Sequence, residues 1–162
     1  MSNLNFLSPI EFRFSIKRLP NVSYNIQSLN IPGITSGITN QPAPFRNIPR
    51  HGDKVEYGDL SLEVIIDEEM RAYTETWYWL LGLTSPDGFD EYKSLSKSQD
   101  GLYSDATLTI MNSNKNPNIE IQFEDIFPIS IGDISLDTKA TDVNPPTTTI
   151  TFKYTKYVVK LI

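Results

Sequence analysis

Residues 51–70 have the sequence HGDKVEYGDLSLEVIIDEEM, and the second half of this stretch decides the fold class. From residue 60 to residue 66 nearly every second side chain is apolar, which is the pattern of a β-strand with one buried face. Asp67 follows directly and is a suitable helix N-cap, while Glu68 and Glu69 would oppose the positive end of the helix dipole. The stretch therefore predicts a strand followed by a helix that begins at Asp67.

The predicted helix carries an apolar stripe and has a glycine at its expected end. The stripe follows helical spacing and consists of Met70, Tyr73, Trp77, Leu80 and Leu81. Gly82 is well placed as the C-terminal stop. An aromatic stripe on one amphipathic helix usually packs in a core, so we expect a helix laid over a sheet rather than a cofactor site.

Further strands are indicated on both sides of this stretch, mostly by the same alternation. Residues 12–16 and 22–31 are expected to form a hairpin around the turn at 19–21, and residues 147–162 one long final strand. The expected strands are 12–16, 22–31, a short one at 45–48, 60–66, 106–111, 119–123 and 147–162, and residues 129–136 carry a further apolar run before the last strand. One helix and about seven strands indicate an α+β, mainly β fold, and residues 1–162 are expected to form a single domain because no repeat or second domain is visible.

Residues 33–57 differ from their surroundings because they have few apolar side chains and no steady period. Glycine and proline punctuate the segment at Gly37, Pro42, Pro44, Pro49, Gly52 and Gly58. Connections of this length are uncommon in a compact domain and are usually functional. We therefore expect a protruding arm over about residues 35–58 that is ordered by a partner, with a short strand near residues 45–48.

Residues 83–101 form a second polar connection, which we expect to be a solvated loop. Its carboxylates suggest a calcium site at first, since they include Asp87, Asp90, Glu91 and Asp100. They lack the ligand spacing, central glycine and terminal glutamate of an EF-hand loop. No calcium site is predicted.

Composition and motifs argue against most kinds of catalysis. The absence of cysteine excludes thiol chemistry and thiolate metal sites. The single histidine, His51, lies in the polar arm, and there is no G-x-S-x-G elbow, P-loop or G-x-G-x-x-G motif. The adjacent carboxylates at residues 67–69 suit helix capping better than glycoside hydrolysis. We predict no enzyme activity, no cofactor and no metal.

Charge and the N-terminal sequence limit the possible environments. The net charge is −6 and the pI about 4.7, which disfavours a sequence-independent grip on nucleic acid. The N-terminus resembles no signal peptide, and no segment has the length of a membrane span, so we expect a soluble protein made inside a cell.

With catalysis and nucleic-acid binding disfavoured, the remaining function class is a binding or structural protein. A sheet with free edges and a long arm can join its copies edge to edge and close into a ring.

The order of segments resembles the tail-tube protein family of T4-type contractile bacteriophages and, more distantly, the tube protein of type VI secretion systems. The resemblance covers nearly the whole chain. The segments that carry it are FRFSI at 12–16 with the following stretch to IPGI at 31–34, RHGD at 50–53, YGDL at 57–60, Asp67 and Glu68 before the helix with Trp77, and IFPISIGDISLD at 126–137.

The resemblance implies an antiparallel β-sandwich or barrel-like subunit flanked by one helix, which assembles into hexameric rings whose inner strands close a continuous barrel. Stacked rings would form the DNA conduit inside a contractile sheath, in the virion tail, after assembly in the host cytoplasm. The arm would contact the adjacent ring, and the candidate inter-subunit contacts are Arg46, Arg50, His51, Asp53 and Tyr57.

The implied partners are other copies of the chain, the sheath protein, the tape-measure protein, and baseplate and neck proteins. Genomic DNA would pass through without specific binding, helped by an acidic lumen, and this chain would insert in no membrane. The apolar residues 157–162 leave open a tube-initiating or hub protein of the baseplate, or a neck or terminator protein with the same fold. A monomeric or low-copy baseplate or chaperone-like binding module is the competing class, and an enzyme is a distant third.

Overall fold

A computed structural model describes residues 5–84, 87–98 and 101–162, and the fold is mainly β, with 46% strand and 19% helix. The elements in chain order are β1 (Phe12–Ile16), α1 (Pro20–Asn25), β2 (Ile26–Leu29), β3 (Ile34–Pro42), β4 (Asn47–Tyr57), β5 (Leu60–Ile65), α2 (Arg71–Thr84), α3 (Phe89–Lys97), β6 (Ser104–Met111), β7 (Pro117–Ile131), β8 (Thr147–Lys153) and β9 (Lys156–Leu161). All strand pairs are antiparallel, as the family resemblance implied.

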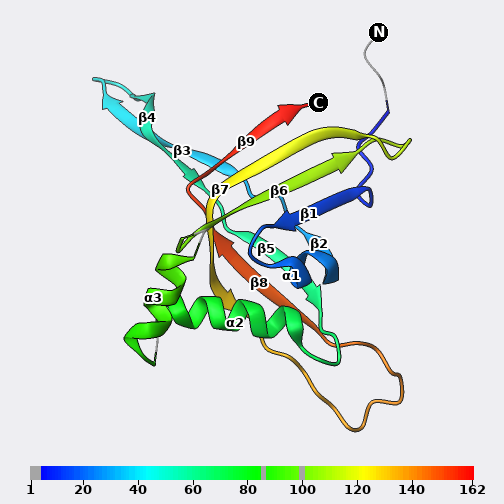
Figure 1. Cartoon of the computed structure of the whole chain (residues 1–162). Coiled ribbons are helices and arrows are strands. Elements are labelled where there is room, and N and C mark those ends of the chain that lie inside the picture. The colour runs from blue at the N-terminus through cyan, green and yellow to red at the C-terminus, as the bar shows by residue number, and fades with distance from the viewer. Residues whose placement is uncertain (1–4, 85–86, 99–100) are drawn as a thin grey trace.

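The main sheet has the strand order β1-β6-β7-β8-β5-β2, and β9 also pairs with β7 (Figure 1). β7 has 15 residues, so its first part pairs with β6 and β9 and its last part with β8. The partner of β7 changes from β9 to β8 near Asp125, whose φ is 55°. The C-terminal chain passes from β8 to β9 at the same level. The predicted single strand over 147–162 is therefore two strands, because the chain bends at Tyr154 and Thr155 to follow both parts of β7.

The core lies between the two parts of this bent sheet and under α2. Alternate residues of β5, β6 and β8 are buried, which confirms the alternation seen in the sequence. Phe14, Phe123 and Phe152 are among the largest fully buried side chains. Removing such apolar surface from water supplies most of the driving force for folding.

The predicted hairpin over residues 12–31 is wrong, because residues 20–25 form helix α1. Pro20 occupies the start of this helix, where its missing N–H would have no partner in any case. Val22 is fully buried while Tyr24 is 89% exposed. With a helix between them, β1 pairs with β6 and β2 pairs with β5.

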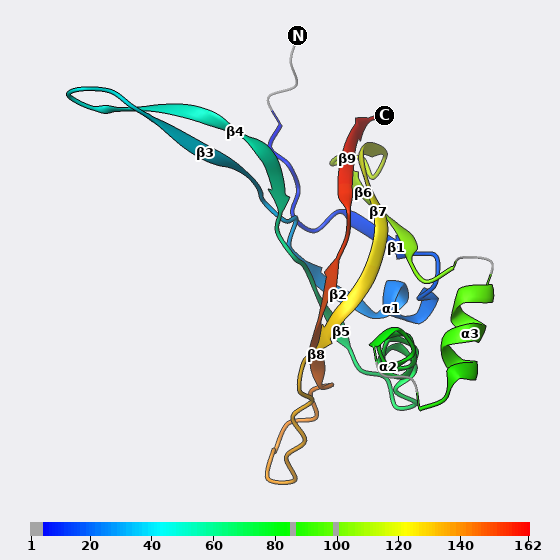
Figure 2. The same cartoon turned by 90° about the vertical axis from the view of Figure 1, so that its left-hand side faces the viewer.

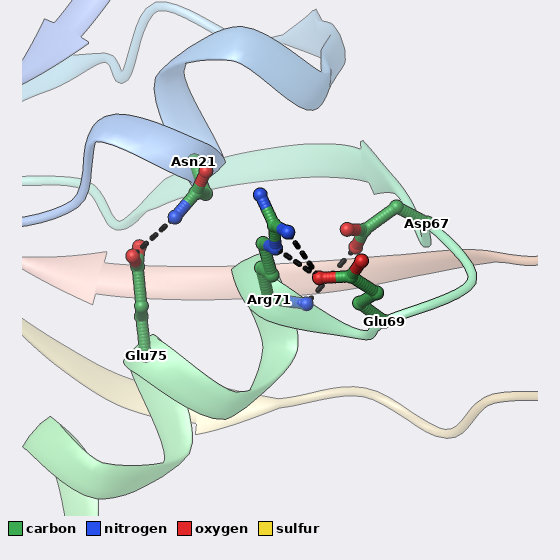
Figure 3. A network of polar contacts seen from close by, with 5 residues as sticks. All are labelled: Asn21, Asp67, Glu69, Arg71 and Glu75. Atoms are coloured by element: carbon green, nitrogen blue, oxygen red, sulfur yellow. Dashed lines mark hydrogen bonds and ion pairs between the residues drawn. The ribbon is translucent and has the colours of Figure 1, made fainter.

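Helix α2 begins later than predicted, at Arg71 rather than Asp67. Residues 67–70 form a turn in which Met70 has a φ of 51°, and the Arg71 amide donates a 3.0 Å hydrogen bond to the Asp67 carboxylate. Glu69 forms an ion pair with Arg71, and one turn further on Glu75 accepts a hydrogen bond from the Asn21 side chain of α1 (Figure 3). The acidic residues thus organise the approach to the helix and tie it to α1.

The buried face of α2 also differs from the predicted stripe. Its buried residues are Ala72, Thr76, Trp79 and Gly82, whereas Trp77 is 40% exposed. Gly82 lies within the helix and does not end it. A Cβ at this position would be 2.2 Å from Leu95 Cδ1, so the glycine allows α3 to lie close against α2.

Helix α3 occupies part of the segment that we expected to be a solvated loop. Asp87, Asp90 and Glu91 lie in its first turn or just before it, and Asp100 lies outside the described residues. Within the described ranges, no three or more His, Cys, Asp or Glu side chains gather in a way that could hold a metal ion.

Candidate functional site

β3 and β4 form a two-stranded hairpin, here called the arm, that projects away from the main sheet (Figures 1 and 2). The sequence placed an arm here but predicted only a short strand near residues 45–48, which is wrong. Every residue of β3 and nearly all of β4 are exposed, so neither face is buried and no alternation develops. Exposed apolar side chains include Ile38 and Phe45. An isolated two-stranded hairpin is at best marginally stable in water, so this geometry favours contact with a partner.

Gly52 lets the arm strands cross closely. The pairing shifts register between Ser36 and Ile38, opposite residues 52–54 of β4. A Cβ on Gly52 would lie 2.3 Å from the Gly37 carbonyl oxygen, which is far inside van der Waals contact. Residue 52 must therefore be glycine for this bulge to form.

The root of the arm is held by tyrosines from the C-terminal strands. The Tyr154 hydroxyl donates to the Gly58 carbonyl at 2.9 Å, and the Tyr157 hydroxyl donates to the Pro32 carbonyl at 3.1 Å. Tyr57 packs edge-on against both rings, with centroids 5.9 Å from Tyr154 and 5.4 Å from Tyr157. Both ends of the arm are thus fixed to the C-terminal part of the chain, in which β8 and β9 each pair with β7.

Burial affects the acidity of Tyr154, whose side chain is only 7% exposed. Desolvation by burial is the largest cause that raises the pKa of Tyr154, to about 12. Electrostatic interactions with Tyr157, Asp59 and Tyr57 act on this pKa in the same direction. The neutral hydroxyl is the form that can donate to the Gly58 carbonyl. The arm root therefore favours a protonated tyrosine.

The five predicted contact residues lie in two places. Arg46 is in the exposed turn at the arm tip, and Arg50, His51 and Asp53 are exposed along β4, where Arg50 Nε donates to Gln41 Oε1 at 3.1 Å. Tyr57 is half-buried at the root and makes contacts within its own subunit. The inter-subunit role of all five residues stays a prediction.

A second projecting segment, the loop at residues 132–146, lies at the opposite end of the molecule from the arm (Figures 1 and 2). One end is fixed where the Gly132 amide donates to the Thr149 carbonyl at 2.7 Å, and the other where the Ile66 amide donates to the Pro146 carbonyl at 2.9 Å. Residues 135–145 are all exposed. Residues 132–137 were used in the sequence as part of the motif IFPISIGDISLD, and no projecting loop was predicted here, although the length of the segment was a usable signal.

The model of the phage tail tube protein family matches residues 10–160. The chain belongs to this family. The family recognition and the mainly β, antiparallel fold predicted from the sequence are confirmed. Because this is a family of structural tube proteins, the chain is a structural component of a tail tube and not an enzyme.

Solved structures of contractile systems share the fold of this tail tube protein. The cap of the anti-feeding prophage, described as a tube terminating cap, has a TM-score of 0.70 at 11% identity, with 100% of this chain and 95% of that chain covered. The sheath-tube complex of an extracellular contractile injection system in its extended state gives 0.63 at 12% identity, covering 98% and 95%. A type six secretion system protein gives 0.51 at 12% identity, covering 91% and 81%. No curated protein matches the chain.

Two further surfaces of the tail tube protein are available for contacts. On α2 the Trp77 and Tyr78 rings lie 5.1 Å apart and are 40% and 65% exposed. In the part of the chain that the structure describes, β9 pairs only with β7, and its Leu161 side chain is 83% exposed. An unpaired strand edge can accept a strand from another copy. None of the described helices is both long and apolar enough to span a membrane.

Proposed function

We propose that residues 1–162 form one tail-tube domain, the repeating subunit of a phage tail tube, in which hexameric rings stack into the DNA conduit of a contractile tail. The arm is the observation that carries this proposal. It exposes both of its faces, including the apolar Ile38 and Phe45, while its root is fixed by Tyr154 and Tyr157. A hairpin that is anchored at its root and leaves apolar side chains uncovered suits a contact that a neighbouring subunit completes.

The available edges support ring formation. β1 and β2 end the strand order of the described chain, and β9 has one free side. Pairing such edges between copies satisfies their backbone groups and removes the exposed edges by closure. In this assembly Arg46, Arg50, His51 and Asp53 on the arm reach the next ring, and Tyr57 acts through the arm root.

The other partners in this proposal are the sheath, tape-measure, baseplate and neck proteins of a virion tail assembled in the host cytoplasm. The exposed Trp77 and Tyr78 on the helical side form a surface suited to the sheath. The net charge of −6 suits a channel through which DNA passes without being bound.

The experiment shortens the arm while keeping its root. Residues 40–49 are replaced by Asn-Gly, a two-residue turn that can join the paired residues Thr39 and Arg50. We expect the variant to fold and to form rings, but to make no tubes in negative-stain electron microscopy, while the intact protein makes both. Far-UV circular dichroism and urea unfolding check the fold. Tubes of ordinary length from the shortened protein, or an intact protein that stays monomeric at high concentration, would count against the proposal.

A second candidate function is a tube terminator or initiator. The similarity in fold to a tube terminating cap favours it. Such a protein forms a ring that does not propagate, so purified intact protein would give single rings and no tubes. Long tubes from the intact protein alone support the repeating subunit instead.

A further inference from the structure

The arm and the 132–146 loop project from opposite ends of the subunit, as both views of the molecule show (Figures 1 and 2). Each is fixed at both ends to the main sheet, the arm through Tyr154 and Tyr157 and the loop through Thr149 and Ile66. Two projections that are anchored at their bases, at opposite ends of the subunit, are placed to meet when copies of the chain stack head to tail.

The two projections carry opposite charge. The outer part of the arm, residues 38–51, contains Arg46, Arg50 and His51 and no acidic residue. The loop contains Asp133, Asp137 and Asp142 against a single lysine, Lys139. Since the chain as a whole has a net charge of −6, a cationic arm tip is a local exception to its overall field.

Apolar side chains accompany the charges on both surfaces. Phe45 at the arm tip is fully exposed, and Leu136 and Val143 in the loop are 85% and 102% exposed. Apolar anchors surrounded by charged groups are typical of protein interfaces, where the charges set orientation and register.

We propose that the arm of one copy binds the 132–146 loop of the next copy along the tube axis, with Arg46 and Arg50 facing the loop aspartates. This inference rests on the proposed function, because it names the partner surface of the arm in stacked rings. The contact uses two different surfaces and is therefore heterologous, so it gives every ring one end of each kind and lets the stack grow without closing.

The test reverses each charge set separately. The arm variant is Arg46→Glu with Arg50→Glu, and the loop variant is Asp137→Lys with Asp142→Lys. The control variant Lys93→Glu with Lys97→Glu makes the same change in net charge as the arm variant, but on exposed positions of α3. A combined variant carries both the arm and the loop changes and keeps the net charge of the wild-type chain. Circular dichroism and urea unfolding first verify that all variants fold.

Tube formation is measured by negative-stain electron microscopy and by the fraction of protein pelleted in the ultracentrifuge. We expect the arm variant and the loop variant, each alone, to form rings with at least a tenfold lower pelleted fraction, because like charges meet. The control variant should form tubes normally. The combined variant and an equimolar mixture of the two single-surface variants should again form tubes, since opposite charges then meet at the contacts.

The outcomes separate the two proposals. If wild-type protein stacks, but the arm and loop variants stack equally well or the mixture fails to form tubes, the arm–loop contact is wrong and the tube function stands. If wild-type protein forms no stacked rings, the tube function is wrong and the head-to-tail contact fails with it.

Discussion

The arm root makes a specific prediction about alkaline stability. Burial raises the pKa of Tyr154 to about 12 in the folded protein, while in the unfolded chain the phenol titrates near its ordinary value of about 10. Between these two values the unfolded chain has released the proton and the folded chain still holds it. Stability from this group is therefore fully present below about pH 10 and is lost as the pH rises toward about 12.

The magnitude follows from the difference between the two pKa values. Each pKa unit corresponds to about 1.4 kcal/mol, so by pH 11.5 Tyr154 alone should lower the free energy of unfolding by about 2 kcal/mol relative to pH 8. The variant Tyr154→Phe lacks this titration but also lacks the hydrogen bond to the Gly58 carbonyl, which at neutral pH contributes about 1 kcal/mol. The variant should be the less stable protein at pH 8 and the more stable one at pH 11.5.

The assay is urea unfolding at pH 8, 10, 11 and 11.5, followed by tryptophan fluorescence. Other tyrosines titrate in both proteins, so the informative quantity is the difference in free energy of unfolding between wild type and Tyr154→Phe. The control is Tyr24→Phe, because Tyr24 is 89% exposed and lies outside the cluster. Curves for wild type and Tyr154→Phe that stay parallel across this range, without crossing, would show that burial of Tyr154 does not control its proton.

Two pairs of substitutions test the packing of α2 and of the arm. Trp79→Ala should lower the free energy of unfolding by roughly 3–5 kcal/mol, because it empties a site that is 2% exposed, whereas Trp77→Ala should lower it by less than about 1 kcal/mol. Urea unfolding followed by circular dichroism measures both values. Equal costs would contradict the assigned buried face of α2. Gly52→Ala should remove hydrogen-exchange protection from arm amides with little change in the urea midpoint of the whole protein. Gly37→Ala should keep more of this protection, because its Cβ would meet nothing within 4 Å. Equal protection of the arm in both variants would exclude the close crossing.

The sequence predicted the elements that bury one face. Alternation correctly located the strands near residues 12–16, 60–66 and 106–111, because each has one side in the core. Helix α1 was missed since six residues are too few to show a helical period. The strands of the arm were missed for a different reason, as neither of their faces is buried.

Long-range contacts explain the remaining errors. Trp79 rather than Trp77 is buried because tertiary packing sets the rotation of α2, and Gly82 continues the helix because Leu95 lies against it. The location of the arm could be predicted from its length and its prolines. Its root could not, because Tyr154 and Tyr157 lie 96 and 125 residues from the carbonyls they contact. No local pattern records such a pairing.

Strand β8 connects the two projections in a way that matters mechanically. It begins beside the loop root, where Thr149 accepts from Gly132, and it ends immediately before Tyr154 at the arm root. Its neighbours β5 and β7 hold it through hydrogen bonds perpendicular to the strand direction. A pull between arm and loop therefore loads these bonds together, in shear, instead of opening them one after another. The subunit can therefore transmit tension between its two ends through β8 together with β5, which lies between Gly58 at the arm root and Ile66 at the loop root.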